Sequence, residues 1–133
     1  MEKAITTPAT SELDAVRSAF TMLSGLYLTA MPKVDPALLN DFLSREKATS
    51  RPLSYTVEVF TKEGVDSEKA REYIYKKTGM MPAVFDHGTH YVTNQILTLE
   101  MLKEISDSDD VLEVHGSYCG GIGMRSAYYE RRQ

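Results

Sequence analysis

The sequence predicts an α+β fold, a ferredoxin-like β-α-β-β-α-β sandwich preceded by an N-terminal helical hairpin. Two observations carry this prediction. Apolar residues recur every three or four positions up to about residue 50, whereas beyond it they alternate in short runs. Those runs and the helical patterns between them follow the order strand, helix, strand, strand, helix, strand. Right-handed crossovers fold that order into a four-stranded antiparallel sheet with two helices on one face.

The N-terminal third is expected to be helical after a short lead-in. Residues 1–10 have little to bury and are predicted to be disordered. Ser11 can cap a helix, and Pro32 ends it. Between them runs one apolar stripe at spacings of three and four, made of Leu13, Val16, Phe20, Leu23, Tyr27 and Ala30. A second helix begins at Asp35-Pro36, so residues 11–50 are predicted to form a helical hairpin.

The ferredoxin-like domain is expected over residues 53–119. The predicted strands are residues 54–61, 81–86, 89–95 and 111–118. One helix begins at Asp66 or Ser67 and ends before Gly79, and another begins at Thr98. Residues 120–133 are predicted to be a glycine-rich hinge and a C-terminal tail.

A sheet with helices on only one face leaves its other face open. The apolar stripe of the N-terminal hairpin is suited to cover that face, either in the same chain or in a neighbouring subunit. We therefore expect a homo-oligomer.

Charge and cysteine content limit the partners and the compartment. The net charge is −4 and the pI is about 5.4, so the chain lacks the basic field that attracts nucleic acid or anionic lipid. The stretch from Ala15 to Met31 is too polar to cross a bilayer, and no signal peptide is recognised at the N-terminus. With the single Cys119, these features predict a cytoplasmic protein without nucleic-acid or membrane partners.

Three histidines and the cysteine suggest a metal site. His87 and His90 flank a predicted turn, and we expect the third strand to begin at the sheet end where the fourth finishes. Cys119 would then approach both imidazoles, and Asp86 or His115 would complete a tetrahedral site for zinc or copper. The alternative is a turn residue, a surface histidine and a free thiol.

A second candidate site is a ligand pocket on the open face. Glu58, Glu113 and His115 are predicted to share that face, where desolvated carboxyls can serve as general acids. A solvated sheet face is the alternative. Because the chain offers no complete catalytic set, we expect a non-enzymatic protein.

Three segments of the predicted domain form one pattern: Gly88-Thr89-His90-Tyr91-Val92, the segment from Leu97 to Ile105, and Asp110-Val111-Leu112-Glu113-Val114. This pattern resembles the prodomain and inhibitor family of subtilisin-type proteases. The last segment has the acid, valine, two residues, valine ending of that family. The resemblance implies the same fold over residues 54–118, and an inhibitor or chaperone of a subtilisin-type protease as one alternative function.

The leading functional prediction is a self-associating binding or regulatory module for a protein or a small molecule. It would act through its sheet face, through the stripe of Leu13, Val16, Phe20, Leu23 and Tyr27, and through its tail, where Tyr128, Tyr129 and Arg131 favour interfaces. The alternatives are a zinc or copper protein, a small ferredoxin-like enzyme acting on a small molecule, and the protease inhibitor.

Overall fold

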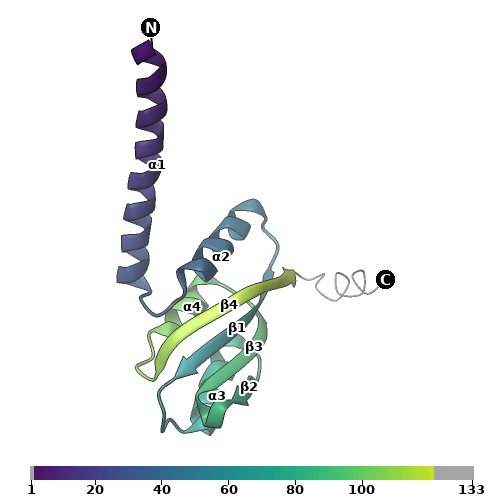
Figure 1. Ribbon diagram of the computed structural model, residues 1–133. Coiled ribbons are helices and arrows are strands. Elements are labelled where there is room, and N and C mark those ends of the chain that lie inside the picture. Colours follow the sequence, from purple (N-terminus) through teal and green to yellow (C-terminus); the bar gives the residue numbers. More distant parts are fainter. Residues whose placement is uncertain (1, 122–133) are drawn as a thin grey trace. The chain divides into compact units, whose positions relative to one another are not determined.

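The computed structural model describes the backbone of residues 2–121 and the side chains of residues 11–120. Over this range the protein is α+β, with four α-helices and a four-stranded antiparallel sheet (Figure 1). The chain divides into two compact units, Met1–Pro32 and Lys33–Gln133. In the described residues, no helix has the length and apolar character needed to span a membrane.

The first unit is one helix, α1, which spans Glu2–Ala30. It begins nine residues before Ser11, so the predicted disordered lead-in over residues 1–10 is wrong from Glu2 onward. Once a first turn exists, each added residue gains a hydrogen bond for the two dihedral angles that it fixes, which favours extension of a helix.

The second unit contains the sheet. Its strands are β1 (Leu53–Thr61), β2 (Ala83–Phe85), β3 (His90–Ile96) and β4 (Val111–Gly121). They lie in the order β2-β3-β1-β4, and every neighbouring pair is antiparallel. The helices α3 (Ser67–Thr78) and α4 (Leu99–Ser106) connect the strands, and a short 3-10 turn, Asp86–Gly88, joins β2 to β3.

Local signals in the sequence fix the helix ends of this unit. The Asp66 carboxylate accepts hydrogen bonds from the first amides of α3, and the Thr98 hydroxyl accepts one from the Met101 amide at the start of α4. Gly79 ends α3 with a φ of 78°, a left-handed conformation that glycine adopts without a Cβ clash. These three predicted caps are confirmed.

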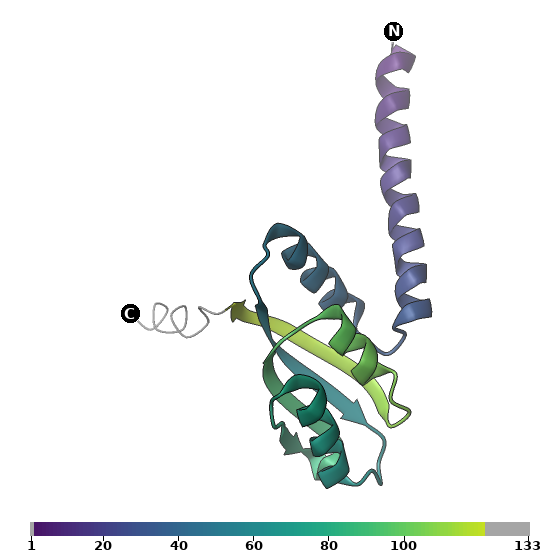
Figure 2. The same ribbon diagram turned by 180° about the vertical axis from the view of Figure 1, so that it is seen from behind.

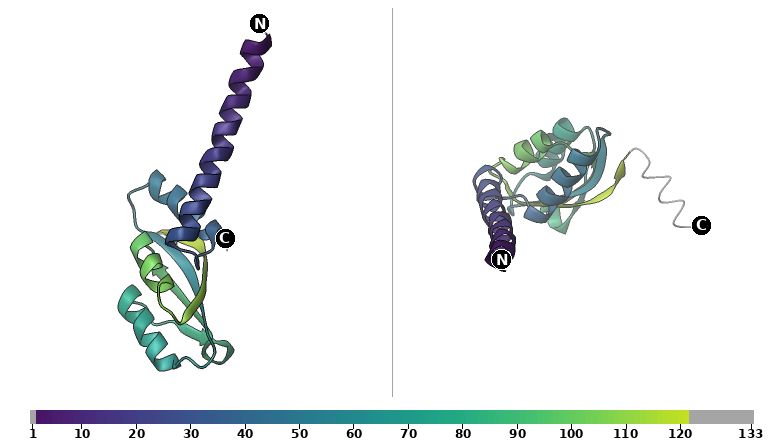
Figure 3. Two further views of the ribbon diagram at one scale, coloured as in Figure 1. Left: turned by 90° about the vertical axis from the view of Figure 1, so that its left-hand side faces the viewer. Right: turned by 90° about the horizontal axis from the view of Figure 1, so that it is seen from above.

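One face of the sheet is covered by three helices rather than two. Alternate residues of β1 point toward it and are buried, Tyr55 and Val57 among them. Figures 2 and 3 show α3, α4 and α2 (Pro36–Ala48) on this same side of the sheet. No helix from the described residues 33–121 lies on the other face.

The position of α2 corrects one prediction about the open face. The buried residues Leu38, Leu39 and Phe42 of α2 belong to the core of the sheet unit, and the Phe42 ring lies 5.8 Å from that of Tyr55. The expectation that α2 covers the open face is therefore wrong. The physical reason is that α2 buries its apolar residues against the inner face of β1, where Tyr55 offers a large apolar contact.

The segment before α2 pairs with the outer edge of β4. Val34 forms a parallel bridge with Val114, in which the Asp35 amide donates to the Val114 carbonyl (2.9 Å) and the Val114 amide donates to the Lys33 carbonyl (2.8 Å). This bridge partly covers an edge that would otherwise expose unpaired backbone groups.

Candidate functional site

The open face of the sheet carries a row of aromatic and titratable side chains. Phe85, His90, Phe60 and Glu113 are paired across the four strands in that order. Because side chains two residues apart share a face, the neighbouring row contains Ala83, Val92, Glu58 and His115. The two rows bring both strand histidines and two glutamates together around Phe60.

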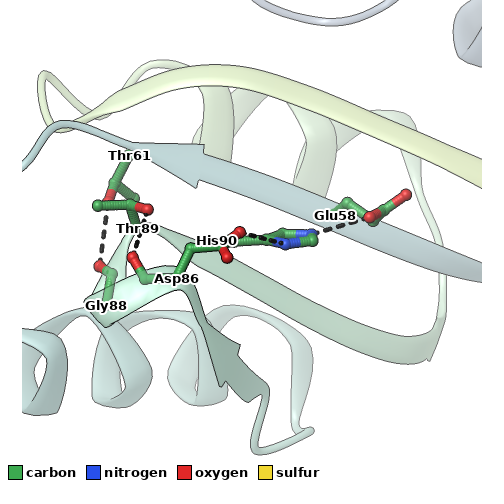
Figure 4. Close-up of polar contacts among 6 residues, drawn as sticks. All are labelled: Glu58, Thr61, Asp86, Gly88, Thr89 and His90. Carbon is green, nitrogen blue, oxygen red and sulfur yellow. Dashed lines mark hydrogen bonds and ion pairs between the residues drawn. The ribbon is translucent and has the colours of Figure 1, made fainter.

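His90 lies between two carboxylates (Figure 4). Its Nε2 is 2.8 Å from Glu58 Oε1, and its Nδ1 is 3.4 Å from Asp86 Oδ2. The imidazole stacks on the Phe60 ring at a centroid distance of 4.4 Å, with the Phe85 ring 5.6 Å away. Its side chain is only 18% exposed, so these four groups form most of its surroundings.

The turn before β3 positions Asp86. Asp86, His87 and Gly88 have φ values of 53°, 58° and 84°, a left-handed run that aspartate and glycine tolerate better than most residues. The Thr89 hydroxyl donates to the Asp86 carbonyl (2.8 Å), and the Thr61 hydroxyl lies 3.4 Å from the Gly88 carbonyl (Figure 4). These contacts hold the turn against the end of β1.

His115 has a similar setting on the other side of Phe60. Its Nδ1 is 3.4 Å from Asp35 Oδ2, its Nε2 is 3.6 Å from Glu113 Oε1, and its ring meets Phe60 edge-on at 5.7 Å. Asp35 reaches His115 because its backbone is bridged to Val114. Phe60 therefore stands between two imidazoles, each flanked by two carboxylates.

Both nitrogens of His90, and both of His115, face carboxylate oxygens. Within the described part of the chain, no three His, Cys, Asp or Glu side chains are grouped so as to hold a metal ion.

The open face is instead acidic with an aromatic centre. Four carboxylates surround the two histidines, those of Asp35, Glu58, Asp86 and Glu113. The described strands direct no lysine or arginine side chain to this face. Carboxylates around exposed aromatic edges suit a cationic ligand, since arginine and lysine bind both groups.

The predicted approach of Cys119 to His87 and His90 is wrong. Both β3 and β4 run antiparallel to β1, so they start at the same end of the sheet. His90 pairs with Phe60, whereas Cys119 lies in a bulge beside Ser54, six positions away along β1. At about 3.3 Å per residue this separates them by about 20 Å.

The predicted pocket residues Glu58, Glu113 and His115 do share the open face. Glu58 pairs directly with His115, and Glu113 is the residue two positions before it. The sequence analysis missed the role of Asp35, which it assigned only to helix capping. Its contact with His115 depends on the bridge between Val34 and Val114, and no local pattern signals a pairing 80 residues apart.

The apolar stripe of α1 is exposed over most of its described length. Leu13, Val16 and Phe20 are 58%, 66% and 62% exposed, and Leu23 is exposed as well. Tyr27 is the exception, because it is buried. The predicted interaction residues Tyr128, Tyr129 and Arg131 lie outside the described residues.

A cavity of about 520 Å³ lies on the covered side of the sheet and is lined in part by the loop after β1. Val59, Ile74 and Ile105 form apolar walls, and Lys62 and Lys69 line it as well. Glu63, Asp66 and Asp110 also line the cavity and offset both lysine charges, so its lining favours no single charge of ligand.

Comparisons of the chain with protein-family models, with curated proteins and with solved structures each give no match. The resemblance to subtilisin prodomains stays a prediction. The two features of the described residues that bear on function are the acidic open face of the sheet and the exposed apolar surface of α1.

Proposed function

We propose that the protein is a non-catalytic, self-associating binding module, in which α1 assembles with α1 of other copies and the sheet unit presents its open face to a cationic partner. The observation that carries this proposal is the exposed apolar surface of α1. Leu13, Val16, Phe20 and Leu23 repeat at spacings of three and four, the pattern of helices that pack side by side.

A solitary amphipathic helix of this composition is unfavourable in water. Isolated helices draw little stability from backbone hydrogen bonding, and most gain it by burying an apolar face. No charged residue occurs from Ser18 to Ala30, so this half of α1 lacks the charged face of an ordinary surface helix. A partner helix that covers this half of α1 would bury its apolar side chains.

The width of the apolar surface favours a bundle of more than two helices. At 100° per residue, Leu26 and Met22 lie progressively further to one side of the stripe and Leu28 lies to the other, and all three are exposed. A two-stranded coiled coil buries a narrow seam, whereas larger bundles bury flanking positions as well.

The same proposal assigns the sheet unit to the ferredoxin-like folds. It is supported by the β-α-β-β-α-β order of the elements and by the position of β1 between β3 and β4. The helix α2 on the covered face is an addition to that plan.

Light scattering coupled to size-exclusion chromatography tests the assembly. We expect the full chain to elute with the mass of three or more copies at 100 µM, and Phe20→Glu to shift it toward the monomer mass, because a carboxylate would be buried in the bundle. Ser18→Glu is the matched control, since at 100° per residue Ser18 lies on the side of α1 opposite Phe20 and the variant adds the same charge there.

A wild-type chain that stays monomeric at this concentration would refute the assembly. Equal loss of mass in the Phe20→Glu and Ser18→Glu chains would assign the effect to charge on the helix rather than to the stripe. Circular dichroism of each variant checks that the sheet unit stays folded.

A further inference from the structure

We propose that the open sheet face is a docking site for the C-terminal segment of the same chain, residues 122–133. The acidic, aromatic face is the receptor, and the arginines and tyrosines of this segment are the ligand. The proposal does not depend on assembly through α1.

Charge complementarity is the first support. Asp35, Glu58, Asp86 and Glu113 give the face four carboxylates around His90 and His115, and the described strands direct no lysine or arginine side chain to it. Residues 122–133 carry three arginines and one glutamate, a net charge of +2. Because the whole chain has a charge of −4, residues 1–121 carry −6, so the segment and the rest of the chain have opposite net charges.

The composition of the segment matches the face in a second way. Tyr128 and Tyr129 stand between Arg125 and the pair Arg131-Arg132. Tyrosine rings pack favourably against Phe60 and Phe85, and guanidinium groups form paired hydrogen bonds with carboxylates. Each feature of the receptor thus has a counterpart in the segment.

The chain is long enough to reach the site. β4 ends at Gly121, which pairs with Leu53, and Phe60 lies seven residues along β1 from there, or about 23 Å. Twelve residues span at most about 40 Å when extended. A segment that turns back over the face therefore places Tyr128 and Tyr129 near Phe60, with the last two arginines within reach of Asp86.

The backbone at the end of β4 has two features that favour a change in chain direction. The pairing with β1 shifts by one residue between Tyr118 and Gly120, a bulge that bends a strand. Gly120 has a φ of 117°, a conformation that is open to glycine and costly for other residues. With Gly121 and Gly123 next to it, the backbone can leave the sheet edge and fold back.

The open face of a second copy is a poorer ligand for this face than residues 122–133. Packing two such faces together would bring eight carboxylates into one interface without a lysine or arginine side chain from these strands. Juxtaposed like charges oppose association. The tethered segment instead has an effective concentration of the order of 1 mM, so an outside basic peptide must displace it.

Backbone NMR spectra test the proposal. We compare the full chain with a chain that stops at Gly121, and with a full-length Arg131→Glu/Arg132→Glu variant. Docking predicts amide shift differences clustered at Phe60, His90 and Glu113 in both comparisons. Raising NaCl from 0.05 to 0.5 M should reduce the differences, because salt screens exposed charge pairs.

A synthetic peptide of residues 122–133, added to the shortened chain, should restore the shifts of the full chain. The control variant is Arg51→Glu, which makes the same charge reversal at an exposed arginine before β1 and should leave these amides unchanged.

Identical spectra of the open face in the full and shortened chains would overturn the proposal. Shift differences that fade on dilution would also overturn it, because they would identify the segment of another copy as the occupant. The mass measured by light scattering should be the same for both chains, so failure of docking and failure of assembly through α1 are separate results.

Discussion

At the residue scale, Tyr55 joins the sheet to α2 through a polar network at the edge of the core. Its hydroxyl donates to Asp41 Oδ2 at 2.6 Å, and Arg45 Nε donates to the same oxygen at 3.0 Å. The Arg45 guanidinium also stacks over the Tyr118 ring, 3.6 Å from its centroid. Burial raises the pKa of Asp41, but the hydrogen bonds from Tyr55 and Arg45 outweigh it and lower that pKa overall.

The same network makes Tyr55 a poor acid. Burial first, and then the hydrogen bond to Asp41, raise its pKa well above the ordinary value. In the unfolded chain the phenol ionises near pH 10, so the folded state loses stability as the pH rises beyond that value.

Removing the Tyr55 hydroxyl tests this network. We expect Tyr55→Phe to lower the free energy of unfolding by about 1.5 kcal/mol at pH 7, the low end for a hydrogen bond to a charged group, because Asp41 retains Arg45 and some solvent contact. The loss of stability above about pH 10 should become shallower. Urea unfolding followed by circular dichroism measures both effects.

The control is Tyr75→Phe, which removes the same atom from an exposed ring on α3. Equal losses in the two variants would show that the Asp41 contact contributes nothing.

At the element scale, the sequence predicts best where the determinants are local. The ends of α3 and α4 follow from Asp66, Gly79 and Thr98, and each cap acts within a few residues of its own helix. The alternation in β1 separates Glu58 from the buried Tyr55 before any partner strand is known.

Long-range packing is where the sequence predicts least. The stripe of α2 is apolar whether it packs on α1 or on the sheet, so periodicity alone does not choose between them. The open-face positions of Glu58, Glu113 and His115 follow from alternation, whereas the error about Cys119 came from the relative direction of β3 and β4. No sequence pattern predicts the bulge at Cys119 either.

A leucine in α2 tests its membership in the sheet core. Leu39 is fully buried, so we expect Leu39→Ala to cost about 2–5 kcal/mol of unfolding free energy. The matched Leu28→Ala change in α1, at a position 67% exposed, should leave urea unfolding of the sheet unit unchanged. Similar costs at both positions would contradict the assignment of α2 to the sheet core.

At the scale of the whole molecule, the chain combines a helix with little core of its own and a unit with a complete core. The buried residues Leu38, Val57, Ile74, Leu102 and Val114 all lie in the second unit and come from five different elements. Such a core suffices for independent folding at about 100 residues.

We therefore expect a chain beginning at Lys33 to fold without α1. Its urea midpoint should match that of the sheet unit in the full chain, and its mass by light scattering should be that of a monomer, because the assembling helix is gone. A fragment that fails to show a cooperative transition would mean that α1 contributes to the core.

The bridge between Val34 and Val114 also determines where tension enters the folded unit. Whatever α1 is attached to, a pull on it is transmitted through Pro32 to Lys33, and the first resisting bonds are the two that clamp Val114. Beyond Val114, β4 is bonded along its length to β1, the strand beside it. The load thus spreads into the middle of the sheet, so the unit is anchored mechanically through β4 rather than through a loosely held end.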